Sequence, residues 1–141
     1  MKDIITKIFS ISALRVLLGL IFLWAFIDKM IGLGFATKMG SGWIHGGSPT
    51  TGFLTYAVKG PFAGLFSSLA GIAFVDWLFM LGLLGIGVSL LTKRFLKLGA
   101  LSGVLMMMLM YLSLLWPENN PFIDEHIVYA VILGYIALNV K

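Results

Sequence analysis

Asp28 and Lys29 stand side by side in the apolar stretch LWAFIDKMIGL, where they could serve a function such as proton relay or take part in a buried ion pair. A charge at bilayer depth costs roughly 2.5–3.5 kcal/mol or more unless it is paired or hydrated. Adjacent residues of a helix point about 100° apart, so the two side chains cannot shield each other. One of them therefore faces the protein interior and the other reaches the membrane surface. The inner one needs a partner, for which Asp76, His126 or a loop lysine are candidates.

Three further ionisable residues begin predicted helices at the same end of the molecule. Asp76 opens the second helix, and Asp124 and His126 lie in the first turns of the fourth. His126 could relay protons or, equally, bond a loop carbonyl. Asp124 and Asp76 could instead stabilise the positive end of a helix dipole, with Asn120 as the helix cap. We take Asp28, Lys29, Asp76 and His126 as candidate catalytic residues.

Several chemistries lack a recognisable motif in this sequence. The chain has no cysteine, so dithiol chemistry would have to come from a partner. Two histidines give no convincing haem or zinc site, and no HExxH, P-loop or dinucleotide-binding pattern is present. We therefore expect no metal, haem or nucleotide cofactor. The net charge of +4 comes from residues at predicted helix ends, which does not favour nucleic-acid binding.

The composition is that of an integral membrane protein. Hydrophobic residues make up 60% of the 141 residues, charged residues 11%, and the mean hydropathy is +1.02. Soluble domains have about 45–50% apolar and about 25% charged residues. The length suits one domain, over residues 1–141.

Four segments are long and apolar enough to span a bilayer, which takes about 20 residues. They cover about 8–34, 72–92, 98–117 and 121–140. The sequence thus predicts an all-α, four-helix membrane bundle. Residues 35–71 are rich in aromatic and apolar side chains, and Pro49 and Pro61 could each begin a short helix. We expect this segment to form an ordered amphipathic cap at the membrane surface.

The distribution of lysine and arginine predicts the orientation. Seven basic residues fall on one side of the predicted spans and three on the other. The first group is Lys2, Lys7, Arg15, Lys93, Arg94, Lys97 and Lys141, and the second is Lys29, Lys38 and Lys59. We expect a multi-pass protein of the cell membrane with both termini cytoplasmic. Arg15 is then interpreted as a side chain that reaches the cytoplasmic surface.

Five stretches of the chain resemble the DoxX family of small bacterial and archaeal membrane proteins. The family is related to DoxD, a subunit of thiosulfate:quinone oxidoreductase that works with a second, DoxA-type subunit. The resemblance extends from Leu14 to about Leu138 and is carried by GLIFLWAFIDKMIGLGFAT, SGWIHGGSPTTGFL, VKGPFAG, VDWLFMLGLLGIG and PENNPFIDEHIVYA. It implies a four-span protein and, for DoxD-like members, oxidation of thiosulfate with electrons passed to quinone. Other DoxX-like proteins are membrane partners in sulfur or oxidative-stress assemblies.

The resemblance leads to two expectations about function. One is a membrane subunit of a quinone-linked oxidoreductase that acts on a small sulfur compound such as thiosulfate, with quinone as co-substrate. The other is a non-catalytic scaffold or assembly subunit of a redox or oxidative-stress complex, with a protein partner or a second copy bound. A proton-coupled carrier is the weakest alternative. The pocket residues expected for the first function are Trp24, His45, Lys59, Trp77, Asp124 and Tyr129.

The charges near this pocket do not suit thiosulfate on their own. Thiosulfate is a dianion, and five acids at the outer end face three lysines. A partner subunit could supply the missing positive charge and the redox centre. We therefore expect a protein partner under either function.

Overall fold

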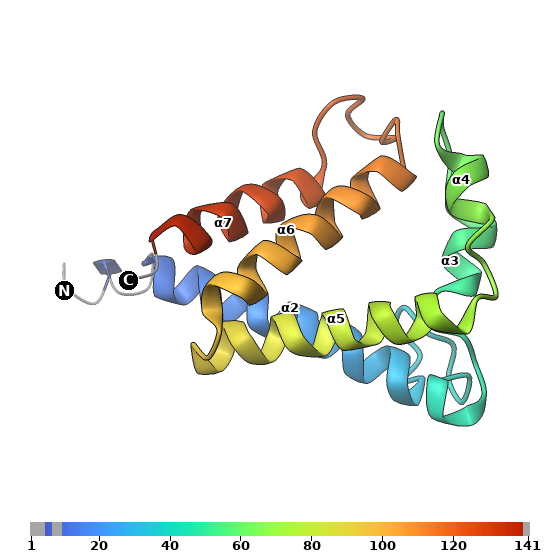
Figure 1. Cartoon of the computed structure of the whole chain (residues 1–141), viewed down its shortest axis with the longest axis horizontal. Helices are drawn as coiled ribbons and strands as arrows, with labels where there is room; N and C mark the ends of the chain where they lie inside the picture. Colours follow the sequence, from blue (N-terminus) through green and yellow to red (C-terminus); the bar gives the residue numbers. More distant parts are fainter. Residues whose placement is uncertain (1–4, 7–9, 140–141) are drawn as a thin grey trace.

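The computed structural model describes residues 5–6 and 10–139, and all regular elements within these residues are helical (Figure 1). Three helices in this part of the chain are long and apolar enough to cross a membrane: α2 (Ile11–Ile31), α5 (Ala73–Thr92) and α6 (Leu96–Ser113). A shorter apolar helix, α7 (Glu125–Asn139), follows them. The expected all-α class and the membrane-type helices are confirmed.

Helix α2 is shorter than the predicted span of 8–34, of which residues 8 and 9 lie outside the described residues. The Ser10 side chain caps its start by accepting a hydrogen bond from the Ala13 N–H at 3.3 Å. Gly32 ends the helix in the left-handed conformation, with φ 78°, and donates its N–H to the Asp28 carbonyl at 2.7 Å. The stop at Ile31 is therefore a glycine cap.

Helix α5 matches its predicted span of 72–92 almost residue for residue, whereas α6 ends earlier than the predicted 117. Pro117 has no N–H to donate to the Ser113 carbonyl, so the helix cannot continue through it. That carbonyl accepts instead from the Lys59 N–H at 3.0 Å, so the end of α6 is joined to the segment between α2 and α5.

Helix α7 begins at Glu125 rather than at the predicted residue 121. Asp124 is the cap, because its Oδ1 accepts from the N–H groups of His126 at 3.0 Å and Ile127 at 3.3 Å. The expectation that Asn120 caps this helix is wrong. Asn120 accepts two backbone hydrogen bonds that close a separate turn before the helix.

The late start makes α7 short for a membrane span. Its 15 residues rise about 22 Å, against about 30 Å for a typical hydrocarbon core. The predicted span reached residue 140, which lies outside the described residues. Of the four expected spans, three thus have spanning length in the described structure.

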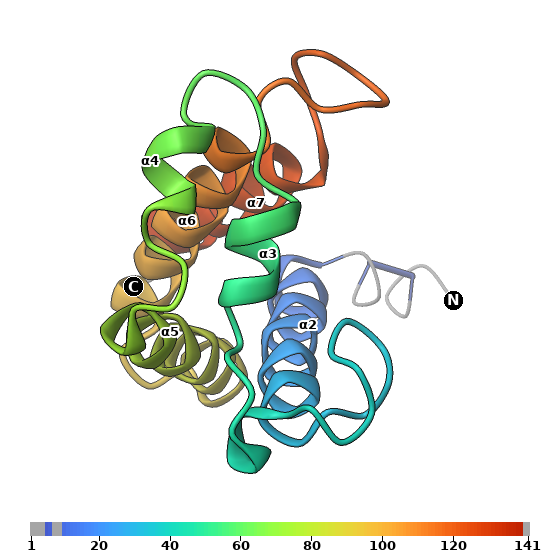
Figure 2. The same ribbon diagram turned by 90° about the vertical axis from the view of Figure 1, so that its right-hand side faces the viewer.

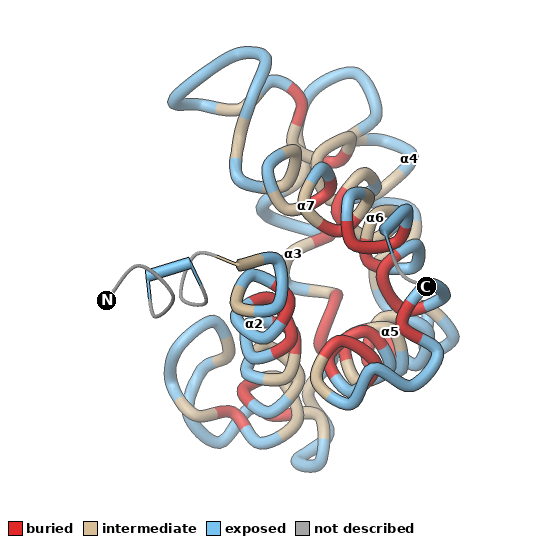
Figure 3. Tube along the Cα trace, turned by 90° about the vertical axis from the view of Figure 1, so that its left-hand side faces the viewer, coloured by how far each residue is buried: buried red, intermediate tan, exposed pale blue. Residues whose placement is uncertain are grey.

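The four apolar helices pack around shared buried side chains. α2 lies against α5, α6 lies against both α5 and α7, and α2 also touches α7. Buried residues face inward and exposed ones outward when the structure is viewed along the helices (Figure 3). The core residues with the least exposure are Leu18, Phe22, Met80, Leu83, Ile86, Leu90, Ala100, Leu133, Ile136 and Ala137.

Arg15 joins the start of α2 to the end of α5. Its side chain is buried, and its guanidinium donates to the carbonyl oxygens of Leu90 and Leu91. The last carbonyls of a helix have no partner within the helix, so a cation here satisfies both the hydrogen bonds and the helix dipole. The interpretation of Arg15 as a surface-reaching side chain is therefore replaced by a buried helix-end contact.

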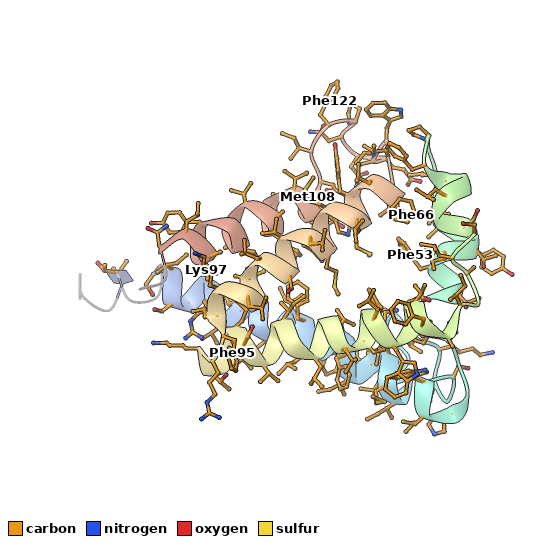
Figure 4. The ribbon with its side chains drawn as sticks, in the orientation of Figure 1. Phe53, Phe66, Phe95, Lys97, Met108 and Phe122 are labelled. Atoms are coloured by element: carbon orange, nitrogen blue, oxygen red, sulfur yellow. The ribbon has the colours of Figure 1, made fainter. Side chains whose placement is uncertain are left out.

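Three short helices occupy the segment between α2 and α5: η1 (Trp43–His45), α3 (Thr51–Tyr56) and α4 (Ala63–Ser67). The predicted short helices after Pro49 and Pro61 are present and begin two residues after each proline. α3 and α4 lie across one end of the long helices (Figure 2). Phe53 and Phe66 point from them toward the long helices (Figure 4).

Candidate functional site

Asp28 lies in the last turn of α2 and is only 1% exposed. Its Oδ2 accepts from the Thr37 N–H at 2.7 Å, and its Oδ1 from the N–H groups of Leu33 at 3.2 Å and Phe35 at 3.4 Å. Both oxygens are thus bonded to the backbone that follows the helix. Such bonds hold a buried carboxylate and satisfy three amides that would otherwise lack acceptors.

These contacts differ from the partners expected for Asp28. The sequence suggested Asp76, His126 or a loop lysine, and none of these bonds Asp28 in the described residues. Nor does Lys29 form an ion pair with it there. The function of Asp28 that the geometry displays is to fix the course of residues 33–37.

Lys29 points to a different part of the same segment. Its side chain is half-buried, its Nζ donates to the Pro49 carbonyl at 3.2 Å, and Nζ lies 5.8 Å from the centre of the Phe79 ring. An ammonium over a ring face at this distance gains cation–π attraction. Lys29 thus links α2 both to Pro49 and to α5.

Asp76 holds the other side of Pro49. This buried residue of the first turn of α5 accepts at Oδ1 from the hydroxyls of Thr50 at 2.6 Å and Ser48 at 2.8 Å. The Thr50 N–H also donates to it, at 3.3 Å. We call residues Ser48–Thr51 the SPTT turn. Lys29 and Asp76 fasten this turn to two different long helices.

Trp24 and Trp77, two of the aromatic residues expected in the pocket, pack against Phe35 and Trp43 instead of against each other. Trp24 meets the Phe35 ring edge-on, with centres 5.1 Å apart, and Trp77 meets Trp43 in the same way at 4.6 Å. Edge-to-face pairs of this kind are favourable. Trp24 and Trp77 each stay about half exposed.

His126 and Asp124 form a second group, apart from the SPTT turn. His126 Nδ1 lies 2.7 Å from Asp124 Oδ2, and the two side chains are 13% and 11% exposed. They border an open polar cleft of about 370 Å³ between the end of α6 and the start of α7. Across this cleft Lys59 Nζ bonds Glu118 Oε1 at 3.0 Å. A histidine fixed by a carboxylate in this way can exchange protons with a ligand.

The remaining expected pocket residues do not join the polar cleft. Tyr129 is half-buried and packs against the apolar core. His45 is exposed in η1, and its side chain makes no hydrogen bond or ion pair within the described residues. The ten candidate residues therefore do not form one site: most lie near residues 33–43, the SPTT turn or the polar cleft, whereas Tyr129 packs in the core and His45 is exposed in η1.

The polar cleft has donors for a metal but little positive charge for an anion. Ligand atoms of Asp124, Glu125 and His126 lie within 4.8 Å of one another. Because Asp124 and His126 already bond each other, their proximity alone does not establish a metal site. Glu118, Asp124 and Glu125 outnumber Lys59 along the lining, which opposes binding of a dianion.

The residues that contact the charged side chains were not predicted from the sequence. Ser48 and Thr50 were part of a turn-like stretch, and Glu118 was counted only as an acid. A usable signal was present, because hydroxyls on both sides of Pro49 can bond an acid at a nearby helix start. The partners of Asp28 are backbone amides, which carry no residue-type signal.

The chain matches no protein-family model, no curated protein and no solved structure. The resemblance to DoxX-like proteins therefore rests on the sequence stretches quoted above and enters the function only as a proposal.

Proposed function

We propose that the chain is a multi-pass membrane subunit in which α2, α5, α6 and α7 cross the bilayer as a four-helix bundle. Three of these helices have spanning length, and local thinning of the bilayer accommodates the shorter α7. Half-exposed Trp24 and Trp77 and exposed Trp116 suit the membrane surface at the end where α3 and α4 lie. From the lysine and arginine distribution we infer that both termini are cytoplasmic.

Residues 32–72, which we call the cap, are proposed to serve as a rigid docking platform for a partner protein. The observation that supports this is the pair of contacts from Lys29 and Asp76 to the SPTT turn. Lys29, Asp76 and Asp28 are thus three charged residues that hold the cap in one shape. A rigid surface loses little conformational entropy when a partner binds.

The composition of the cap indicates which surface its partner would need. The cap contains two lysines and no acid, and Lys59 is paired with Glu118 whereas Lys38 is exposed. Several large apolar side chains stand out from it, namely Phe35, Met39, Ile44, Tyr56 and Leu65. A partner with an apolar patch and an acidic rim complements this surface. The DoxX resemblance suggests that this partner is a redox or oxidative-stress enzyme.

The test is co-purification of the tagged full chain from membranes of its source organism, comparing cap variants with a matched control. Phe35→Ser and Tyr56→Ser remove exposed apolar side chains of the cap, and Leu138→Ser removes one at the far end of α7. We expect a partner that is lost from the two cap variants and kept by the control. A partner kept by all three variants, or none with wild type, would contradict the docking function.

A second function, quinone-linked oxidation of a small sulfur compound, is favoured by the His126–Asp124 pair at the polar cleft. Two thiosulfate ions would join through a new S–S bond, and quinone would accept the two electrons and two protons. His126 is placed to deliver a proton. The acidic lining of the cleft makes this function the weaker proposal for the chain alone.

Quinone reduction by the purified chain distinguishes the two functions. A soluble quinone analogue and thiosulfate are added, and quinone reduction is followed optically. Turnover that His126→Gln abolishes would establish the catalytic function. Lack of turnover by a folded wild-type protein would leave docking as the function.

A further inference from the structure

A groove runs along the outer surface where α5 and α6 meet. Its volume is about 520 Å³, and it is open along one side. Most of its lining is apolar or small, and Arg94 is its charged residue. The lining residues used below are Leu81, Gly85, Thr92, Arg94, Phe95 and Gly99.

The groove exists because Gly85 leaves space that no neighbouring side chain fills. A Cβ at Gly99 would overlap the Ser89 side chain, and one at Gly82 would press on Met106. At Gly85 a Cβ would meet nothing within 4 Å. Gly99 and Gly82 thus allow close packing of the helices, whereas the surface at Gly85 is open and can contact a bound ligand.

The groove has the length of one membrane leaflet. From Leu81 to Thr92 the α5 backbone rises about 16 Å, given about 1.5 Å per residue. Half of a typical hydrocarbon core of about 30 Å is about 15 Å. An acyl chain that enters from the turn between α5 and α6 would therefore follow the groove to the middle of the bilayer.

The mouth of the groove carries positive charge that no residue in the described part of the chain neutralises. Lys93, Arg94 and Lys97 are exposed, and their side chains make no hydrogen bond or ion pair within the described residues. Exposed Phe95 lies between them at the turn (Figure 4). The Phe95 ring is thus flanked by three cations that have no side-chain partner among residues 5–6 and 10–139.

We propose that this groove binds one anionic phospholipid, with an acyl chain over Gly85 and the phosphate at Arg94. Arginine offers a fork of N–H donors that matches phosphate oxygens, and basic pockets between membrane helices suit anionic headgroups. A second copy of the chain fits less well, since a symmetric contact would bring two sets of these cations together. The site is independent of the docking function of the cap.

Native mass spectrometry of the full chain in detergent tests this site. Phosphatidylglycerol is the anionic probe, and phosphatidylcholine with the same acyl chains is the zwitterionic one. We expect one phosphatidylglycerol to stay bound at lipid concentrations where phosphatidylcholine does not. Arg94→Gln should weaken binding about fivefold, the change expected for one basic residue at an anionic surface.

Two pairs of variants separate the groove from general attraction to charge. Gly85→Leu fills the groove and leaves the cations in place, so it should reduce phosphatidylglycerol binding at least fivefold. Gly52→Leu, at another glycine with open space, should leave binding unchanged. Lys38→Gln removes an exposed cation at the opposite end and serves as the control for Arg94→Gln.

Every outcome of this experiment bears on the site. Equal binding of both lipids, or wild-type binding by Arg94→Gln, would overturn it. Binding that Arg94→Gln weakens and Gly85→Leu leaves intact would mean attraction to the basic turn without use of the groove. A dimer that Gly85→Leu disrupts, in place of a lipid adduct, would assign the groove to a second copy.

Discussion

Lys29 of α2 and Asp76 of α5 hold the same turn from two sides. Lys29 Nζ donates to the carbonyl of Pro49, and Asp76 Oδ1 accepts from the hydroxyls on either side of that proline. Neither residue bonds the other in the described structure. Two ionisable groups that looked catalytic in the sequence are thus coupled through four residues of the cap, which is a structural use of charge.

Asp76→Ala should loosen the SPTT turn without disturbing the long helices. The substitution removes three hydrogen bonds to a carboxylate, each of the kind that contributes about 1.5–3 kcal/mol. Amide hydrogen exchange of residues 48–56 should accelerate at least tenfold in detergent. Asp124→Ala is the matched control, because it removes a carboxylate that caps α7 and should affect only the start of that helix. Unchanged exchange in 48–56 would show that Asp76 does not hold the turn.

Asp28→Asn should act mainly on the Thr37 amide. An asparagine keeps one acceptor oxygen but presents NH₂ where the other carboxylate oxygen was. If the oxygen stays with Leu33 and Phe35, the Thr37 N–H faces a donor and loses its 2.7 Å bond. Exchange of this amide should then accelerate, while α2 keeps its protection. A direct role in catalysis predicts the opposite pattern, in which activity is lost and exchange at residues 33–37 is unchanged.

Hydropathy predicted the long helices well because burial in lipid demands continuous apolar runs. The bounds of α5 were predicted to within one residue. The end of α6 and the start of α7 were not predicted, because hydrogen bonds of individual residues determine where these helices end and begin. The Ser113 carbonyl accepts a hydrogen bond from the Lys59 N–H, and the Asp124 carboxylate accepts from two N–H groups of α7. The bond from Lys59 comes from a distant segment of the chain, and the bonds to Asp124 are local caps that a hydropathy average does not register.

For the candidate site, residue types showed where charge gathers but not what it binds. The described acids lie near the cap or between α6 and α7, as the helix order implied. Asp28 accepts from backbone amides and Asp76 from hydroxyls and one amide, groups that look unremarkable in a sequence. The partners of Arg15 were not predictable from residue types either, because they are the backbone carbonyls of Leu90 and Leu91.

Arg15→Leu should destabilise the protein more than Arg15→Lys. Leucine leaves the Leu90 and Leu91 carbonyls without a donor in an apolar setting, at a cost of about 1–3 kcal/mol. Lysine restores the charge and part of the bonding, so we expect a loss of about 1 kcal/mol. Thermal unfolding in detergent measures both, with exposed Lys97→Leu as a control expected within about 0.5 kcal/mol of wild type. Equal stability of all three variants would argue against the helix-end contact.

Gly60→Ala should separate the cap from the end of α6. Gly60 has φ 80°, and a Cβ there would lie on top of the Leu115 carbonyl oxygen. The chain must move away, which also strains the bond from the Lys59 N–H to the Ser113 carbonyl. The conformational strain alone costs about 1–3 kcal/mol, so the unfolding temperature should fall and the Lys59 amide should exchange faster.

The matched control for this change is Gly64→Ala in α4, where a Cβ would meet nothing within 4 Å. Alanine at a compatible position restricts the unfolded chain and stabilises by about 0.4–1 kcal/mol. The same substitution, four residues apart, should therefore shift the unfolding temperature in opposite directions. Parallel shifts would mean that the cap does not rest on the end of α6, and its function as a rigid platform would lose its main mechanical support.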